Sequence, residues 1–190
     1  MPNTPPFVSV IMAGGSGTRF WPLSKKTLPK QYLKLFGNRT LIQNTVDRLR
    51  PITSEKDIFI CSGKSQSALL KEQVPEITNL ILEPVARNTA PCLMLTVDHL
   101  LKKGFPLSTA MVVLPADHFI ANEEAFRANL KEAVQFASSE NALVTLGIRP
   151  TSPHTGYGYI EVDDKQKDGV FKTKRFVEKP TLEKAQDFFE

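Results

Sequence analysis

A short apolar run that leads directly into a glycine-rich turn constrains this chain more than any other feature. Residues 8–13 read V-S-V-I-M-A, the pattern of a buried strand, and G-G-S-G-T-R follows at once. The glycines permit positive φ and close backbone approach, so amide groups can point at an anion without a Cβ in the way. Arg19 and Lys30 add positive charge nearby. The run predicts a strand followed by a phosphate-binding loop; the alternative is a glycine-rich connection that binds nothing.

The spacing excludes the two commonest phosphate loops. A P-loop requires four residues between its glycines and then Gly-Lys-Ser/Thr, and no such run follows this strand. A dinucleotide fingerprint would use Gly15 and Gly17, but it then needs a glycine or alanine where Phe20 stands. We therefore expect a longer, extended loop that wraps around a nucleotide.

Apolar runs of strand length alternate with segments of helical period along most of the chain. This alternation predicts an α/β fold, a Rossmann-like and mostly parallel sheet flanked by helices. The expected strands are residues 8–13, 57–61, 79–82, 110–114 and 142–146. The expected helices are residues 41–49, 65–74, 90–103 and 123–138. Thr40 and Thr89 are candidate helix caps, and Gly104 is a candidate terminator.

The pattern changes after residue 147. A linker rich in proline and threonine leads to two strand patterns, residues 157–162 and 170–177, around a polar turn. They predict a C-terminal β-hairpin, and residues 181–190 begin an amphipathic helix. We expect a nucleotide-binding α/β part over residues 1–150, and the hairpin with the start of a helix over residues 151–190.

Several polar or small residues come directly after the expected strands. Ala13, Glu83, Asp117 and Gly147 each lie at a strand end or shortly after it. Ligands of open α/β sheets bind at the carboxyl ends of the strands, where the strand order reverses. We therefore expect these positions to meet in one crevice.

Composition narrows the range of partners. A net charge of +4, from 24 basic and 20 acidic residues, suits small anionic ligands and is too weak for a nucleic-acid-binding arm. The two cysteines form no paired framework, which indicates a reducing compartment. The apolar stretch at residues 7–13 is too short for a signal or membrane segment. We expect a cytoplasmic protein with no nucleic-acid or membrane partner.

Short segments in a fixed order carry a resemblance to a known family. A-G-G-S-G-T-R-F-W-P-L-S at residues 13–24, with L-P-K-Q-Y-L at 28–33, resembles the signature of nucleoside-diphosphate-sugar pyrophosphorylases. E-P-V-A-R-N-T-A-P at 83–91, P-A-D-H at 115–118 and F-V-E-K-P at 176–180 are similar to the guanine, metal and sugar-phosphate segments of bacterial mannose-1-phosphate guanylyltransferases. The resemblance spans the whole chain and implies a fold of the nucleotide-diphospho-sugar transferase type.

The resemblance also implies a reaction, in which GTP and α-D-mannose 1-phosphate give GDP-mannose and pyrophosphate with Mg²⁺ as cofactor. Members of that family continue into a W-N-S-G-type segment and a second metal-binding aspartate, neither of which is in this sequence. We therefore expect a truncated chain that is weak or inactive by itself. A homo-oligomer is an option for the full-length form.

The same resemblance implies the roles of individual residues. The catalytic residues would be Arg19, Lys30 and Asp117, with Asp117 also the Mg²⁺ ligand. The nucleotide-binding residues would be Gly14, Gly15, Ser16, Gly17, Thr18, Glu83, Arg87, Asn88 and Thr89. The sugar-phosphate-binding residues would be Gly156, Gly158, Glu178 and Lys179.

Each group also has an ordinary structural explanation. Single basic residues are usually solvated, an aspartate after a strand often caps the next helix, and residues 83–89 could serve only to start a helix. The hairpin residues could form a glycine kink and a surface ion pair. Two other functions stay open, a nucleotidyltransferase for a different base and a non-catalytic nucleotide-sensing module.

Overall fold

The computed structural model describes residues 6–15, 20–85, 88–165 and 169–189. The chain divides into two compact units, Met1–Val144 and Thr145–Glu190. None of the described helices is long and apolar enough to cross a membrane.

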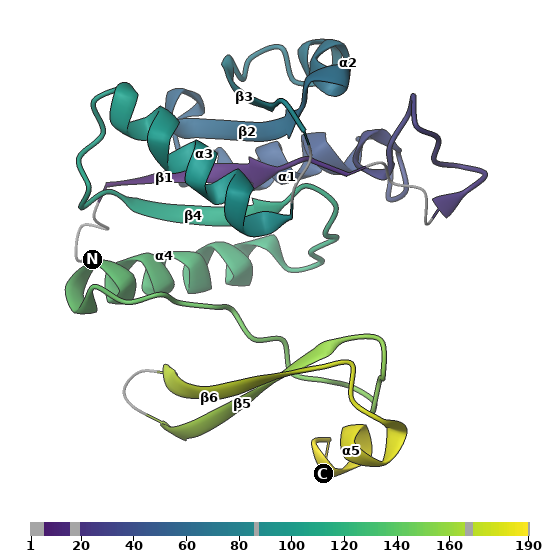
Figure 1. Cartoon of the computed structure of the whole chain (residues 1–190), viewed down its shortest axis with the longest axis vertical. Helices are drawn as coiled ribbons and strands as arrows, with labels where there is room; N and C mark the ends of the chain where they lie inside the picture. Colours follow the sequence, from purple (N-terminus) through teal and green to yellow (C-terminus); the bar gives the residue numbers. More distant parts are fainter. Residues whose placement is uncertain (1–5, 16–19, 86–87, 166–168, 190) are drawn as a thin grey trace. The chain divides into compact units, whose positions relative to one another are not determined.

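The first unit contains a four-stranded sheet in which every pair of neighbours is parallel (Figure 1). Its strand order is β3-β2-β1-β4. The strands are β1 (Phe7–Met12), β2 (Ile58–Gly63), β3 (Asn79–Glu83) and β4 (Ala110–Pro115). The sequence prediction of a parallel α/β sheet is confirmed, with these four strands close to their expected positions.

Three described helices connect successive strands of the sheet, as parallel pairing requires, and a fourth follows β4. They are α1 (Leu41–Leu49), α2 (Ser67–Gln73), α3 (Thr89–Lys102) and α4 (Glu123–Glu140). Short 3₁₀ turns precede or follow them at η2 (Lys30–Tyr32), η3 (Glu55–Asp57) and η4 (Lys64–Gln66). All four expected helices are present.

The ends of α1 and α3 show how local chemistry sets the helix boundaries. Thr40 caps α1 in a reciprocal capping box with Gln43, as predicted. The prediction that Thr89 caps α3 is wrong, because the helix begins one residue earlier and Thr89 lies within its first turn. Asn88 occupies the cap position without a side-chain hydrogen bond to the helix. Gly104 follows the helix with a φ of +87°, which a glycine adopts without strain.

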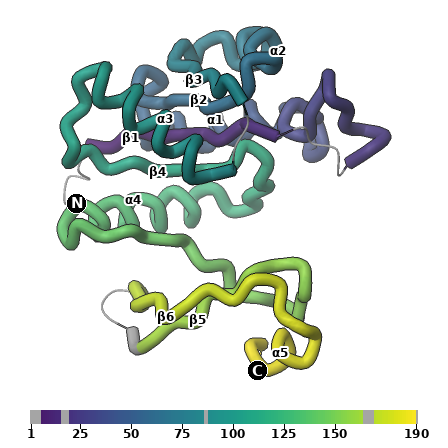
Figure 2. Tube along the Cα trace, in the orientation of Figure 1, coloured from purple at the N-terminus to yellow at the C-terminus, as the bar shows by residue number. Residues whose placement is uncertain are grey.

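The core of the first unit lies on both faces of the sheet. Residues alternate along each strand, so Ile58 and Ile60 pack with α1, α2 and α4, whereas Phe59 and Cys61 pack with α3. The tube in Figure 2 shows the chain passing from the end of β4 into α4. Because helices cover both faces of the sheet, we expect the side chains that bind a ligand to lie at the strand ends and in the connecting loops.

The prediction of a fifth strand at residues 142–146 is wrong. These residues follow α4, which ends at Asn141 in the left-handed conformation, and they form no strand. Leu143 is fully exposed and Leu146 is 39% exposed. The run has the length and apolar character of a strand, but no described strand lies beside it to complete a ladder.

The second unit contains the predicted hairpin. The antiparallel strands are β5 (Gly158–Lys165) and β6 (Phe171–Glu178), and α5 (Leu182–Asp187) follows. Thr181 caps α5 by accepting a hydrogen bond from the backbone of Lys184. The rings of Tyr159 and Phe188 lie 5.4 Å apart, so the hairpin and the chain after α5 pack on each other.

Candidate functional site

The strand order of the sheet reverses at β1, which has β2 and β3 on one side and β4 on the other. In open α/β sheets, this reversal leaves a crevice at the carboxyl ends of the strands. A cleft of about 430 Å³ lies there, within the size range of ligand sites. Residues expected at the site line it, namely Gly14, Gly15, Glu83, Asn88, Thr89 and Asp117.

A second cleft, of about 490 Å³, lies at the opposite end of the sheet, where Phe7 begins β1 and Asp57 precedes β2. It contains none of the residues that the motifs single out, and its two ionisable groups, Asp57 and Lys131, come from unrelated elements. The cleft at the carboxyl ends is therefore the better candidate, although it is slightly smaller.

Two opposite charges meet at the cleft. The Lys30 ammonium, on η2, lies 3.3 Å from Oδ2 of Asp117, which follows β4. The same ammonium lies over the ring of Phe20, 4.6 Å from its centroid. Both charged side chains remain partly open to solvent. The pair thus holds a cation and a carboxylate where an incoming ligand can reach both.

The turn after β1 brings the backbone close to Glu83. Gly15 has a φ of +99°, a conformation that other residues rarely adopt. A Cβ on Gly14 would lie 3.3 Å from Oε2 of Glu83, tighter than an ordinary contact. Of the other expected nucleotide-binding or catalytic residues, Ser16, Gly17, Thr18, Arg19 and Arg87 lie outside the described residues.

A buried hydrogen-bond network supports the turn, and no motif predicted it. The Gln66 side-chain oxygen accepts from the Gln31 amide at 2.9 Å, the Tyr32 hydroxyl at 3.0 Å and the Ser62 hydroxyl at 3.2 Å. The Gln66 amide donates to the carbonyl of Gly15 at 3.1 Å. Gln31 also donates to the carbonyl of Ala13 at 2.7 Å. The network fixes the backbone on both sides of Gly14.

The loop that carries Asp117 is tied to α1 in a similar way. Thr45 donates to the carbonyl of Ala116 at 3.4 Å, and Arg48 donates to the carbonyl of His118 at 3.3 Å. Arg48 is buried and also pairs with Glu123. Burial lowers the pKa of its guanidinium, and Glu123 opposes that effect. The sequence did contain a hint of this role. Arg48 occupies a position in the apolar stripe of α1, where a charged residue is unusual.

Two expected site residues have strained backbones. Asn88 has a φ of +37° and Lys179 a φ of +43°; among the described residues, Asn141 is the other non-glycine with positive φ. Asn141 is an ordinary left-handed helix end, whereas Asn88 and Lys179 fall in loops that the motifs assign to ligands. Such strain gathers at functional sites, so it favours these two loops as binding elements.

The expected sugar-phosphate residues lie together in the second unit. Gly158 and Glu178 are cross-strand partners at the open end of the hairpin, and Lys179 donates its backbone amide to Tyr157 at 3.1 Å. The Lys179 ammonium lies 3.2 Å from the Glu178 carboxylate, and both side chains are exposed. A Cβ on Gly156 would lie 2.8 Å from the His154 ring. Gly147, which was expected to follow a fifth strand, also belongs to this unit and follows no strand.

The two cysteines are not candidate nucleophiles. Cys61 and Cys92 are free and buried. Burial raises the pKa of both thiols, so little reactive thiolate exists at neutral pH.

The chain matches the nucleotidyl transferase family over residues 8–190, and it belongs to that family. It is 44% identical over 186 residues to the mannose-1-phosphate guanylyltransferase of Escherichia coli K12, a match that covers 94% of this chain and 39% of the relative. It is 41% identical over 187 residues to the mannose-1-phosphate guanylyltransferase of Salmonella typhimurium, with 96% and 39% covered.

A solved structure agrees with the fold. The crystal structure described as mannose-1-phosphate geranyltransferase from Thermus thermophilus matches with a TM-score of 0.86 and 36% identity, covering 96% of this chain and 53% of that chain. These findings confirm the resemblance seen in the motifs. The chain spans about two fifths of the length of the curated relatives it matches.

Proposed function

We propose that this chain is the nucleotide-binding part of a mannose-1-phosphate guanylyltransferase, which joins GTP and α-D-mannose 1-phosphate to give GDP-mannose and pyrophosphate. The observation that carries the proposal is the meeting of the Gly14–Gly15 turn with Lys30 and Asp117 at one cleft, in a chain of this family. The names of the two curated relatives support the choice of substrates.

The reaction needs positioning and charge neutralisation rather than a covalent residue. A phosphate oxygen of the sugar phosphate attacks the α phosphorus of GTP, the bond to the oxygen that bridges to the β phosphorus breaks, and pyrophosphate leaves in line. Negative charge grows on the leaving group. Lys30, held between Asp117 and the ring of Phe20, supplies a fixed cation that offsets this charge without reorganising.

Mg²⁺ is the expected cofactor, and the donor set at the cleft fits it. Mg²⁺ prefers one or two carboxylates and completes its octahedron with phosphate oxygens and water, and the Asp117 and Glu83 carboxylates line the cleft. Asp117 would hold the ion. Bound there, Mg²⁺ would withdraw charge from the phosphates of the nucleotide.

The loop between β3 and α3 is the proposed base-binding element, and a carboxylate there favours guanine. Guanine presents N1–H and N2–H₂ as neighbouring donors, and the Glu83 carboxylate can only accept hydrogen bonds. Adenine lacks this pair of donors. Asn88 and Thr89 line the same cleft and can meet the remaining polar edge of the base.

Thermal unfolding with Mg²⁺ and saturating GTP, beside ATP, UTP and dTTP, tests the proposal. A ligand at a hundred times its Kd adds about 2.7 kcal/mol. For a domain of this size that free energy corresponds to a rise in Tm of about 5–10 °C. We expect this rise with GTP and a much smaller one with the other nucleotides. Equal shifts would favour a transferase for another base, and no shift with any nucleotide would contradict the proposal.

A turnover assay on the full-length protein separates an enzyme from a sensor. Pyrophosphate release from GTP should require mannose 1-phosphate. Binding of GTP without any release of pyrophosphate would indicate the non-catalytic alternative.

A further inference from the structure

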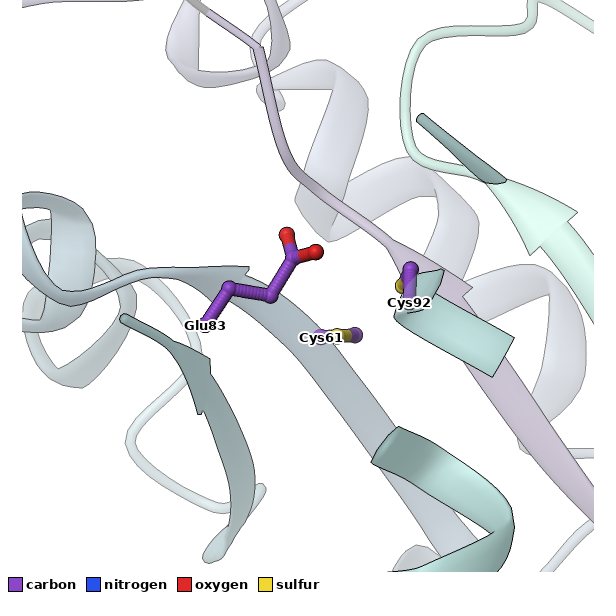
Figure 3. A group of neighbouring side chains, drawn as sticks. All are labelled: Cys61, Glu83 and Cys92. Atoms are coloured by element: carbon purple, nitrogen blue, oxygen red, sulfur yellow. The ribbon is translucent and has the colours of Figure 1, made fainter. Parts of the chain in front are cut away.

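Three buried side chains from separate elements lie close together (Figure 3). Cys61 lies on β2, Glu83 ends β3, and Cys92 lies in the first turn of α3. Their exposed fractions are 0%, 7% and 5%, respectively. Each offers one ligand atom, and the two sulfurs and the carboxylate oxygen all lie within 4.8 Å of one another.

Among the described residues, the carboxylate in this cluster forms no ion pair. No hydrogen bond or ion pair to the Glu83 side chain occurs in the described part of the chain, although more than nine-tenths of the residue is buried. Glu83 lines the cleft, and a cation bound beside the carboxylate would neutralise its charge. The reaction proposed above uses neither thiol, so the convergence of both sulfurs on this carboxylate has no other assigned purpose.

We propose that Cys61, Glu83 and Cys92 form a binding site for a thiophilic divalent cation such as Zn²⁺ or Cd²⁺. Two sulfurs and one carboxylate oxygen are a donor set for zinc, and three protein ligands leave a fourth position for water or a ligand atom. Glu83 and Cys92 line the cleft, so the metal would lie at its floor. The sulfurs distinguish this site from the proposed Mg²⁺ site, because Mg²⁺ takes oxygen ligands.

The distances between the three ligand atoms need only a small adjustment for a metal ion to bind. Sulfurs bound at about 2.3 Å to a tetrahedral zinc ion lie about 3.8 Å apart. The ligand atoms here lie within 4.8 Å of one another, so rotations of the side chains can close the site. On binding, each thiol releases its proton to solvent, and two thiolates with one carboxylate leave the zinc site with one net negative charge.

Occupation of this site would interfere with the nucleotide, an effect that rests on the proposed function. The cation would hold the Glu83 carboxylate, which is the group proposed to accept hydrogen bonds from guanine. We therefore expect Zn²⁺ or Cd²⁺ to weaken GTP binding, whereas Mg²⁺ supports it. Metal binding itself does not depend on that function.

The test is a titration of the reduced protein with Co²⁺ and Cd²⁺ under anaerobic conditions. Co²⁺ reports on the ligands by absorption, since a thiolate-to-cobalt charge-transfer band appears only if sulfur coordinates. Calorimetry with Cd²⁺ gives the stoichiometry and affinity. We expect one ion per chain and a clear charge-transfer band.

Substitutions of the three residues test which of them coordinate the metal. Cys92→Ser and Glu83→Gln keep the size of each side chain and should weaken binding at least about tenfold, by analogy with losses seen on altering the surroundings of metal ligands. Cys61→Ala should weaken binding and lower the intensity of the charge-transfer band, since only one thiolate remains; if it fails to fold, Cys92→Ser still tests the site. Ser62→Ala is the matched control, because Ser62 is equally buried on β2 but faces the other side of the sheet. It should retain the band and the affinity.

Two results would overturn the proposal: a protein that binds neither ion stoichiometrically, and a Cys92→Ser variant that keeps the full intensity of the charge-transfer band and the wild-type affinity. The nucleotide experiment is separate from these. If the protein binds Cd²⁺ through the three residues but binds no nucleotide, the proposed function fails and the metal site stands.

Discussion

Replacing Gln66 by leucine tests whether the buried network supports the turn after β1. Gln66 receives three hydrogen bonds, from Gln31, Tyr32 and Ser62, and donates one to Gly15. Leucine has a similar volume but can neither accept nor donate. Gln31 and Ser62 each retain a contact with the carbonyl of Ala13, at 2.7 Å and 3.2 Å. The Tyr32 hydroxyl, by contrast, loses its acceptor in a side chain that is 3% exposed.

The lost hydrogen bonds determine how far the free energy of unfolding should fall. A buried donor left without an acceptor costs about 1–3 kcal/mol, and each of the other hydrogen bonds contributes about 0.5–1.5 kcal/mol net. Gln66→Leu should therefore lower the free energy of unfolding by about 2.5–7.5 kcal/mol. Gln135→Leu, at an exposed position of α4, is the matched control and should change it by less than about 0.5 kcal/mol.

A double-mutant cycle tests whether the unpaired Tyr32 hydroxyl accounts for the loss of stability. Tyr32→Phe removes the hydroxyl that Gln66→Leu leaves without an acceptor, so in that background Gln66→Leu should cost about 1–3 kcal/mol less. Urea unfolding followed by circular dichroism gives all four free energies. A coupling below about 0.5 kcal/mol, or a single-variant cost near that of Gln135→Leu, would refute the reasoning.

Three further predictions concern the site and its supports. Asp117→Asn should lower turnover of the full-length protein about 10²–10³-fold, measured as pyrophosphate release, and a rate near wild type would contradict the role of Asp117. Burial raises the pKa of Tyr32 from 10.0 to about 12, so the folded state keeps a proton that the unfolded state loses. The stability from Tyr32 is present below pH 10 and should fall as the pH rises towards 12; Tyr32→Phe should show a shallower fall over this range in unfolding experiments. Thr40→Ala should cost about 1–2 kcal/mol by removing the cap of α1, whereas Thr40→Ser should retain most of that stability.

The sequence predicted the sheet well because its central strands, β1 and β2, are buried on both faces. Continuous apolar runs such as residues 8–13 and 58–61 have few alternatives to a central parallel strand. Thr40 followed by Gln43 is a local cap signal and needs no tertiary partner. The same reasoning failed at residues 142–146, because an apolar run becomes a strand only beside another strand.

The site was predicted only in part, for a related reason. Glycines, Lys30 and Asp117 belong to contiguous motifs, so a single sequence reveals them. Gln31 and Gln66 are 35 residues apart, and their hydrogen bond exists only because η2 and η4 meet under the turn. The group formed by Cys61, Glu83 and Cys92 likewise depends on the packing of β2, β3 and α3.

The close contact between Gly14 and Glu83 limits the order in which substitutions can accumulate here. A methyl group at residue 14 would lie 3.3 Å from the glutamate carboxylate, and the network around Gln66 holds the neighbouring backbone in place. A lineage that first shortened residue 83 could later accept alanine at residue 14, whereas the reverse order would pass through a crowded intermediate. The two positions are therefore epistatic in one direction: a substitution at residue 14 depends on residue 83, whereas residue 83 can change first.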